Sequence, residues 1–96
     1  MDVSEFQRWM QERYGERDRA RGEDRTFCWF VEEVGELSRA LRKGTKDDVV
    51  HEIGDAFAWL ASVANLAGVD LEDALERYAK ACPKCAKSPC ACAFVP

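Results

Sequence analysis

The chain has 96 residues, enough for one domain with a modest core, and its composition of 47% hydrophobic and 33% charged residues is typical of a folded soluble domain. A net charge of -4 argues against a nucleic-acid polymer as partner, and no apolar run is long enough to span a membrane. Because the first residues are acidic and amphipathic rather than signal-like, we expect a cytoplasmic protein whose five cysteines stay reduced.

The first predicted helix covers residues 2–14. It carries apolar residues at helical spacing and begins with Asp2 and Glu5, which are spaced for a capping box. Gly15 is expected to end it, which leaves the polar segment 15–24, rich in both charge signs, as a loop.

Two longer helices are predicted at 26–43 and 46–67. A tight turn at Gly44 separates them, and Thr45 with Asp48 forms a capping-box pattern at the start of the second. Because the turn is so short, we expect these two helices to be antiparallel neighbours.

A fourth helix is expected at 70–81, between Gly68 and Pro83. No segment shows the two-residue period of a strand. The sequence therefore predicts an all-α, four-helix domain over 1–81, followed by a short Cys-rich tail over 82–96. A domain of this size is expected to form a dimeric helical bundle.

Five carboxylates form two motifs on the central helices, away from their apolar stripes. Residues three or four apart share a helix face, and hard cations such as Mg²⁺ or Mn²⁺ take oxygen ligands. The alternative is that these acids are solvated surface charge. This alternative is weakened because a second acidic motif lies on the adjacent helix and because few Lys or Arg side chains accompany the acids. The predicted metal ligands are Glu32, Glu33 and Glu36 in "EEVGE", then Glu52 and Asp55 in "EIGD".

The segments "FVEEVGELSRAL" and "HEIGDAFAWLASVANLAGVDLEDAL" carry EExxE followed by ExxD, and over roughly residues 4–81 the chain resembles the MazG-type nucleotide pyrophosphohydrolases of the all-α NTP pyrophosphatase superfamily. The resemblance implies Mg²⁺-dependent hydrolysis of a nucleoside triphosphate, NTP or dNTP, to the monophosphate and pyrophosphate. It also implies removal of non-standard or excess nucleotides, and a homodimer or a dimer of dimers. One glutamate, Glu32 or Glu33, would act as general base.

Five other residues are candidates for contact with the substrate. Trp29 and Trp59 flank the acidic faces and offer π-faces for a base, although ordinary core or dimer-interface packing is the alternative. Arg25, the last of four arginines before the first motif, and Lys80 are candidates for phosphate binding, against the alternative of solvated charge. Asn65 is included because the resemblance implies an Asn near the substrate.

The tail spaces four cysteines as CxxC and then CxC, at Cys82, Cys85, Cys90 and Cys92. This is metal-ligand spacing, and a structural Zn²⁺ in a zinc knuckle is the favoured interpretation. An Fe–S cluster, disulfides or a metal-free tail are the alternatives. The remaining cysteine, Cys28, is expected to be a buried helix residue.

Two other function classes fit parts of the pattern. One is a non-enzymatic helical module that binds a nucleotide or a partner and carries the zinc-binding tail. The other is a di-iron carboxylate bundle, which is disfavoured because neither acidic motif contains the Glu-x-x-His that such bundles use.

Overall fold

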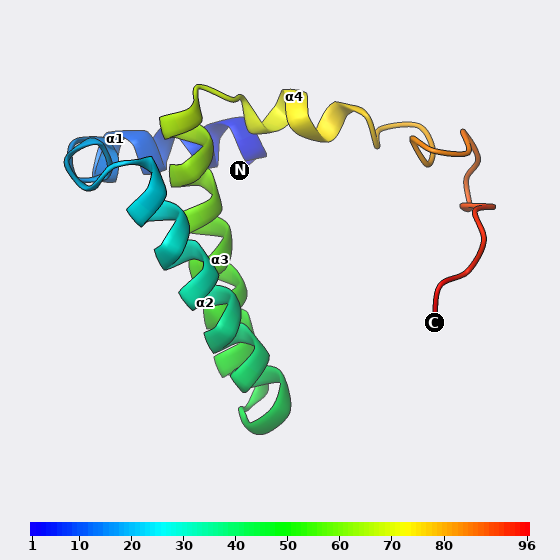
Figure 1. The fold of residues 1–96 in the computed structure, drawn as a ribbon, viewed down its shortest axis with the longest axis horizontal. Helices are drawn as coiled ribbons and strands as arrows, with labels where there is room; N and C mark the ends of the chain where they lie inside the picture. The colour runs from blue at the N-terminus through cyan, green and yellow to red at the C-terminus, as the bar shows by residue number, and fades with distance from the viewer.

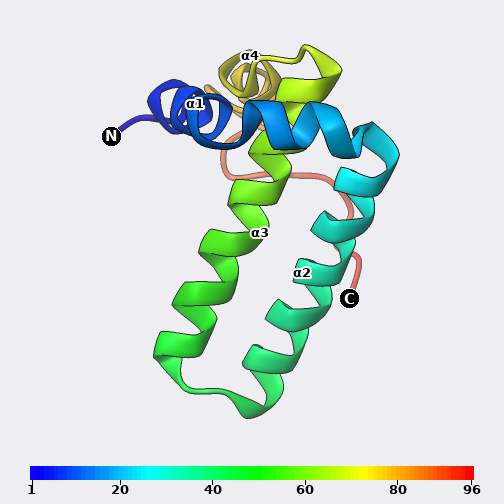
Figure 2. The ribbon, with the colours of Figure 1, turned by 90° about the vertical axis from the view of Figure 1, so that its left-hand side faces the viewer.

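The computed structural model describes all 96 residues and contains four helices and no strand. These are α1 (Val3–Arg21), α2 (Glu23–Lys43), α3 (Lys46–Ala67) and α4 (Leu71–Glu76). Helices α2 and α3 form a long antiparallel hairpin, and α1 lies across its open end (Figure 2). Helix α4 and the tail lead away from this frame (Figure 1). The predicted all-α fold is confirmed, and no helix has the length and apolarity needed to cross a membrane.

The predicted loop over 15–24 is wrong. Helix α1 continues through Gly15 to Arg21, and α2 begins at Glu23. A glycine in a helix interior costs only about 1 kcal/mol, and the following residues favour the helix, with an ion pair between Asp18 and Arg21 one turn apart. The connection therefore shrinks to a single residue.

Gly22 is that single residue. Its φ of 91° lies where L-residues are rarely found. Its N–H donates to the Asp18 carbonyl at 2.8 Å, and its own carbonyl accepts the N–H of Thr26 at 3.1 Å. Gly22 thus ends one helix, starts the next and sets the angle between them.

The turn between α2 and α3 agrees with the sequence. The Thr45 N–H donates to Asp48 Oδ2 at 2.9 Å, and the Asp48 N–H donates to Thr45 Oγ1 at 3.2 Å, which completes the capping box. Helix α3 ends at Gly68 in the left-handed conformation. Helix α4 is shorter than predicted, ending at Glu76 rather than residue 81, because little beyond Leu71 packs against the domain.

The core is small and lies where α1 crosses α3. Its buried apolar members are Met10, Ala61, Ala64 and Leu71. Gln7 fixes this crossing: its amide nitrogen donates to the Asn65 side chain at 3.0 Å and to the Val69 carbonyl at 2.9 Å, and its amide oxygen accepts the Leu71 N–H at 2.8 Å. Cys28 is exposed on α2, so its predicted burial is wrong.

The connection of α1 to α2 through Gly22 can be tested by measuring stability. Gly22→Ala should lower the free energy of unfolding by about 1–3 kcal/mol, because alanine must adopt a positive φ. Gly35→Ala is the matched control: it lies within α2 with no atom within 4 Å of an added Cβ, so it should raise stability by about 0.5–1 kcal/mol. Urea unfolding followed by circular dichroism measures both, and equal effects would contradict the assigned role of Gly22.

Candidate functional site

The acidic residues of α2 and α3 meet between the two helices of the hairpin. Burial raises the pKa of Glu33, and the facing carboxylates Asp55 and Glu52, with Glu36 on its own helix, raise it further. The hairpin therefore brings the second and third acids of the first motif opposite both acids of the second motif.

These residues fit a divalent cation. Oε2 of Glu52 is buried with no hydrogen-bond partner, which is costly for a carboxylate unless a cation lies beside it. Oxygen ligands from Glu52 and Asp55 lie within 4.8 Å of each other and of a ring nitrogen of His51. Carboxylate oxygens are the donors that Mg²⁺ prefers.

His51 is a neighbour of this site that sequence reasoning set aside. Its Nε2 lies 3.2 Å from Oδ2 of Asp55, one helical turn along α3. The sequence analysis compared His51 only with the adjacent Glu52. The i, i+4 spacing of His51 and Asp55 was the signal that predicts this contact.

Glu32 is the acid of the two motifs that is not among the carboxylates raising the pKa of Glu33. Its side chain is exposed on α2, as is that of Glu36. Successive helical residues point about 100° apart, so Glu32 is turned away from Glu33, although it shares a helix face with Glu36.

A cavity of about 210 Å³ adjoins the cluster through Asp55. Its walls come from α1 and α3, and they combine apolar surface with a few polar groups: Met10, Tyr14, Asp18, Asp55, Ala58, Trp59 and Ser62. Trp59 stacks against Trp29 of α2, with ring centroids 6.0 Å apart and ring planes 21° apart. The predicted tryptophans therefore meet at the edge of this cavity.

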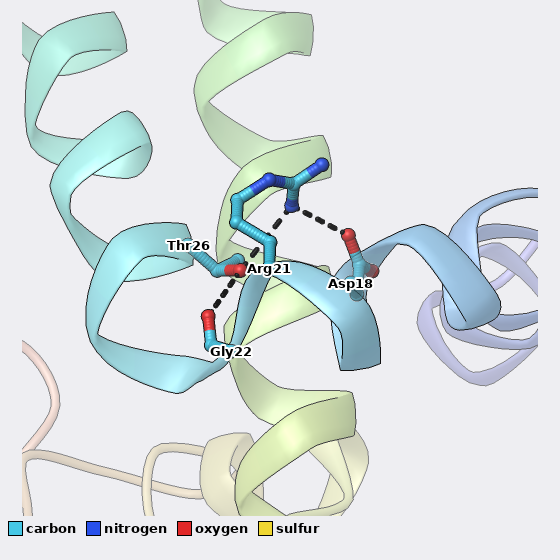
Figure 3. A network of polar contacts seen from close by, with 4 residues as sticks. All are labelled: Asp18, Arg21, Gly22 and Thr26. Atoms are coloured by element: carbon cyan, nitrogen blue, oxygen red, sulfur yellow. Dashed lines mark hydrogen bonds and ion pairs between the residues drawn. The ribbon is translucent and has the colours of Figure 1, made fainter.

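A polar network holds α1 against the start of α2 beside this cavity (Figure 3). Arg21 donates to Asp18 Oδ1 at 2.9 Å and to Thr26 Oγ1 at 3.2 Å. The hydroxyl of Thr26 donates to the Gly22 carbonyl at 2.7 Å. The Arg21 guanidinium also lies 4.8 Å from the centre of the Trp59 ring.

Asp18 is the unusual member of this network. It is only 3% exposed, and its second oxygen, Oδ2, is buried without a hydrogen-bond partner. The sequence analysis missed Asp18 because it assigned residues 15–24 to a loop. The i, i+3 spacing of Asp18 and Arg21 in an unbroken helix was the signal that could have found it. Thr26 was also missed, and no local pattern marks it.

The remaining predicted substrate contacts lie in different places. Arg25 is exposed in the first turn of α2. Asn65 is engaged by Gln7 at the crossing of α1 and α3, and it does not line the cavity beside Asp55. Lys80 follows α4 and lines a hollow shared with tail cysteines. The structure therefore does not bring Asn65 or Lys80 to the acidic cluster.

The tail cysteines come together as their spacing predicted. Cys82 Sγ lies 3.8 Å from Cys92 Sγ, and Cys85 Sγ lies 3.9 Å from Cys90 Sγ. The backbone N–H of Ala91, with that of Lys87, lowers the pKa of Cys85 to about 6. Hydrogen bonds with Cys90 and Cys82 raise the pKa of Cys92 to about 11.

The Arg21 network can be tested by a double-mutant cycle. Arg21→Met should lower the free energy of unfolding by about 1–3 kcal/mol, because it leaves the buried Asp18 carboxylate without its donor. Combining it with Asp18→Asn should recover part of that loss. Arg19→Met, an exposed neighbour, is the control and should change stability by less than about 0.5 kcal/mol. Additive losses in the double variant would contradict the coupling.

Comparison with known proteins agrees with this geometry. The family model of the MazG nucleotide pyrophosphohydrolase domain matches residues 21–86, more than half of the chain, and includes both acidic motifs. The uncharacterized protein YvdC of Bacillus subtilis (strain 168) is 27% identical over 95 residues, an alignment that covers 81% of this chain and 90% of that protein. Because the family model matches more than half of the chain, the chain belongs to the MazG nucleotide pyrophosphohydrolase family.

Proposed function

We propose that this protein hydrolyses nucleoside or deoxynucleoside triphosphates between the α and β phosphates, in a reaction that depends on Mg²⁺. The observation that carries the proposal is the acidic cluster: Asp55, Glu52 and Glu36 all raise the pKa of Glu33, and one oxygen of Glu52 is buried with no hydrogen-bond partner. A cluster of this kind is costly unless cations bind to it, and a triphosphate brings the charge that such cations bind.

Each acid has a proposed role. Glu33, Glu36, Glu52 and Asp55 would hold Mg²⁺, with Mn²⁺ as a substitute. The bound cation supplies charge stabilisation at the phosphate oxygens and a water of lowered pKa. Glu32 is assigned as the general base, because it is exposed on α2, whereas the Glu33 carboxylate faces Asp55 and Glu52 across the hairpin.

The substrate would lie along the acidic face of α2 with its base in the cavity. Arg25, Trp29, Glu32 and Glu36 follow one another at spacings of three or four residues, so they share this face. Arg25 is therefore placed to contact a phosphate. Trp59 would form a wall of the base site, and the free oxygen of Asp18 would accept a hydrogen bond from an amino group of the base.

The reaction can be tested with a panel of NTPs and dNTPs and pyrophosphate detection. We expect pyrophosphate release with Mg²⁺ and none after chelation. Asp55→Asn and Glu36→Gln should lower turnover more than about 100-fold through loss of metal ligands. Glu32→Gln should lower kcat by about 100-fold or more while metal affinity is kept. Glu12→Gln, an exposed acid on α1, is the matched control and should retain full activity.

Two results would contradict the proposal. Nucleotide binding by calorimetry without turnover of any substrate would instead indicate a non-enzymatic nucleotide-binding module. Unchanged turnover in the Asp55 and Glu36 variants would remove the acidic cluster from the mechanism.

We further propose that the protein forms a homodimer through the α2–α3 hairpin. Each of these helices carries a stripe of apolar side chains spaced three, four or seven residues apart. These side chains are 36–66% exposed within one chain: Phe27, Val31, Val34 and Leu41 on α2, and Val50, Ile53, Phe57 and Leu60 on α3. Such spacing is typical of helices that pack in bundles, and a second hairpin would cover both stripes. Two such dimers could associate further.

The dimer can be tested by sedimentation. The wild-type protein should have twice the 10.9 kDa chain mass at micromolar concentration. Ile53→Asp should produce a monomer, because the buried interface would have to desolvate an unpaired charge. Leu75→Asp on α4, which is 50% exposed but outside the hairpin, is the control and should leave the dimer intact. A monomeric wild-type protein would refute the interface.

A further inference from the structure

The Cys-rich tail holds four sulfur atoms in the arrangement of a metal site that is separate from the acidic cluster. The Sγ atoms of Cys82, Cys85, Cys90 and Cys92 all lie within 4.8 Å of one another, and all four cysteines are free thiols. The closest pairs are 3.8 Å and 3.9 Å apart. A tetrahedral zinc ion with Zn–S bonds of about 2.3 Å separates its ligands by about 3.8 Å.

The backbone of the tail is folded around these sulfurs. The Cys82 carbonyl accepts the N–H of Ala86 at 2.8 Å, and the Cys82 N–H donates to the Lys87 carbonyl at 3.0 Å. These two bonds close the CxxC turn into a compact loop. The N–H groups of Ala91 and Cys92 donate to the sulfurs of Cys85 and Cys90, each at 3.3 Å. Donors aimed at ligand sulfurs are the supporting contacts that metal-bound thiolates receive.

Apolar burial does not hold this loop together. No residue after Leu71 is buried, so the tail has no core to offset the conformational entropy of ordering it. A bound metal ion supplies that stabilisation in small domains that lack a core. Charge is consistent with this: four thiolates around Zn²⁺ carry two net negative charges, and Lys84 and Lys87 place two positive charges in the same loop.

We propose that Cys82, Cys85, Cys90 and Cys92 together bind one Zn²⁺ per chain as a tetrahedral structural site. Four thiolates leave no open coordination position, so the ion orders the tail and takes no part in chemistry. The soft sulfur ligands separate this site from the oxygen ligands of the acidic cluster. The zinc site therefore stands whether or not the protein hydrolyses nucleotides.

The first test is the zinc content of the full chain, purified under reducing conditions and measured by mass spectrometry. One zinc per chain is expected for the wild type, and less than about a tenth of that for the Cys85→Ser/Cys90→Ser double variant. Cys28→Ser is the matched control and should keep its zinc, because this exposed thiol lies on α2. Glu52→Gln should also keep it, which excludes adventitious zinc in the acidic cluster. Replacement by Co²⁺ should give the intense sulfur-to-cobalt absorption of a tetrahedral thiolate site.

The second test is limited proteolysis, which does not depend on activity. Trypsin should cleave after Lys84 and Lys87 at least about tenfold faster once zinc is removed by a chelator, and at that fast rate in the double variant with or without zinc. The helical circular dichroism of the domain should stay unchanged, which shows that only the tail has been released.

Several outcomes would overturn the proposal. These are a wild-type chain without zinc, zinc that persists in the double variant, a brown protein with iron and inorganic sulfide, or a chain whose mass is lower by the hydrogens of two disulfides. Equal cleavage after Lys84 and Lys87 with and without zinc would also overturn it, because the ion would then order nothing.

Discussion

The packing of α2 against α3 sets the positions of both acidic motifs. It places Glu33 and Glu36 opposite Glu52 and Asp55, so burial and then these neighbouring carboxylates raise the pKa of Glu33. The two ends of the hairpin hold this arrangement. The capping box of Thr45 and Asp48 fixes the closed end, and the packing of α1 fixes the open end.

The small core stabilises one end of the molecule, and the acidic cluster lies along the hairpin. Apolar burial is concentrated at the crossing of α1 and α3, where Gln7 satisfies backbone and side-chain groups together. The hairpin beyond this crossing keeps its apolar stripes uncovered within one chain. The end of the molecule at the crossing of α1 and α3 is thus fixed by its own packing. We propose that the hairpin binds a cation through its acids and a second copy of the chain through its apolar side chains.

Two kinds of candidate metal ligand are separated within the 96 residues. The hairpin offers carboxylate oxygens, which favour hard cations, and the tail offers thiols, which favour soft ones. The ribbon leads away from the hairpin before the cysteines are reached (Figure 1). On our proposals, this difference in ligand type would keep Mg²⁺ at the hairpin and Zn²⁺ in the tail.

Features that depend on residues a few positions apart could be predicted from the chain alone. These are the bounds of α3, its capping box, the two acidic motifs on adjacent helices and the grouping of the four tail cysteines, which follow from periodicity, caps and ligand spacing. The folded structure was needed to show that Gly22 alone joins two helices, that Arg21 lies over Trp59, and that Asn65 bonds to Gln7 at the crossing with α1. The last two contacts depend on which helix faces meet. The crossing of α1 over α3 sets those faces, and it brings together residues far apart in the chain that no local pattern relates.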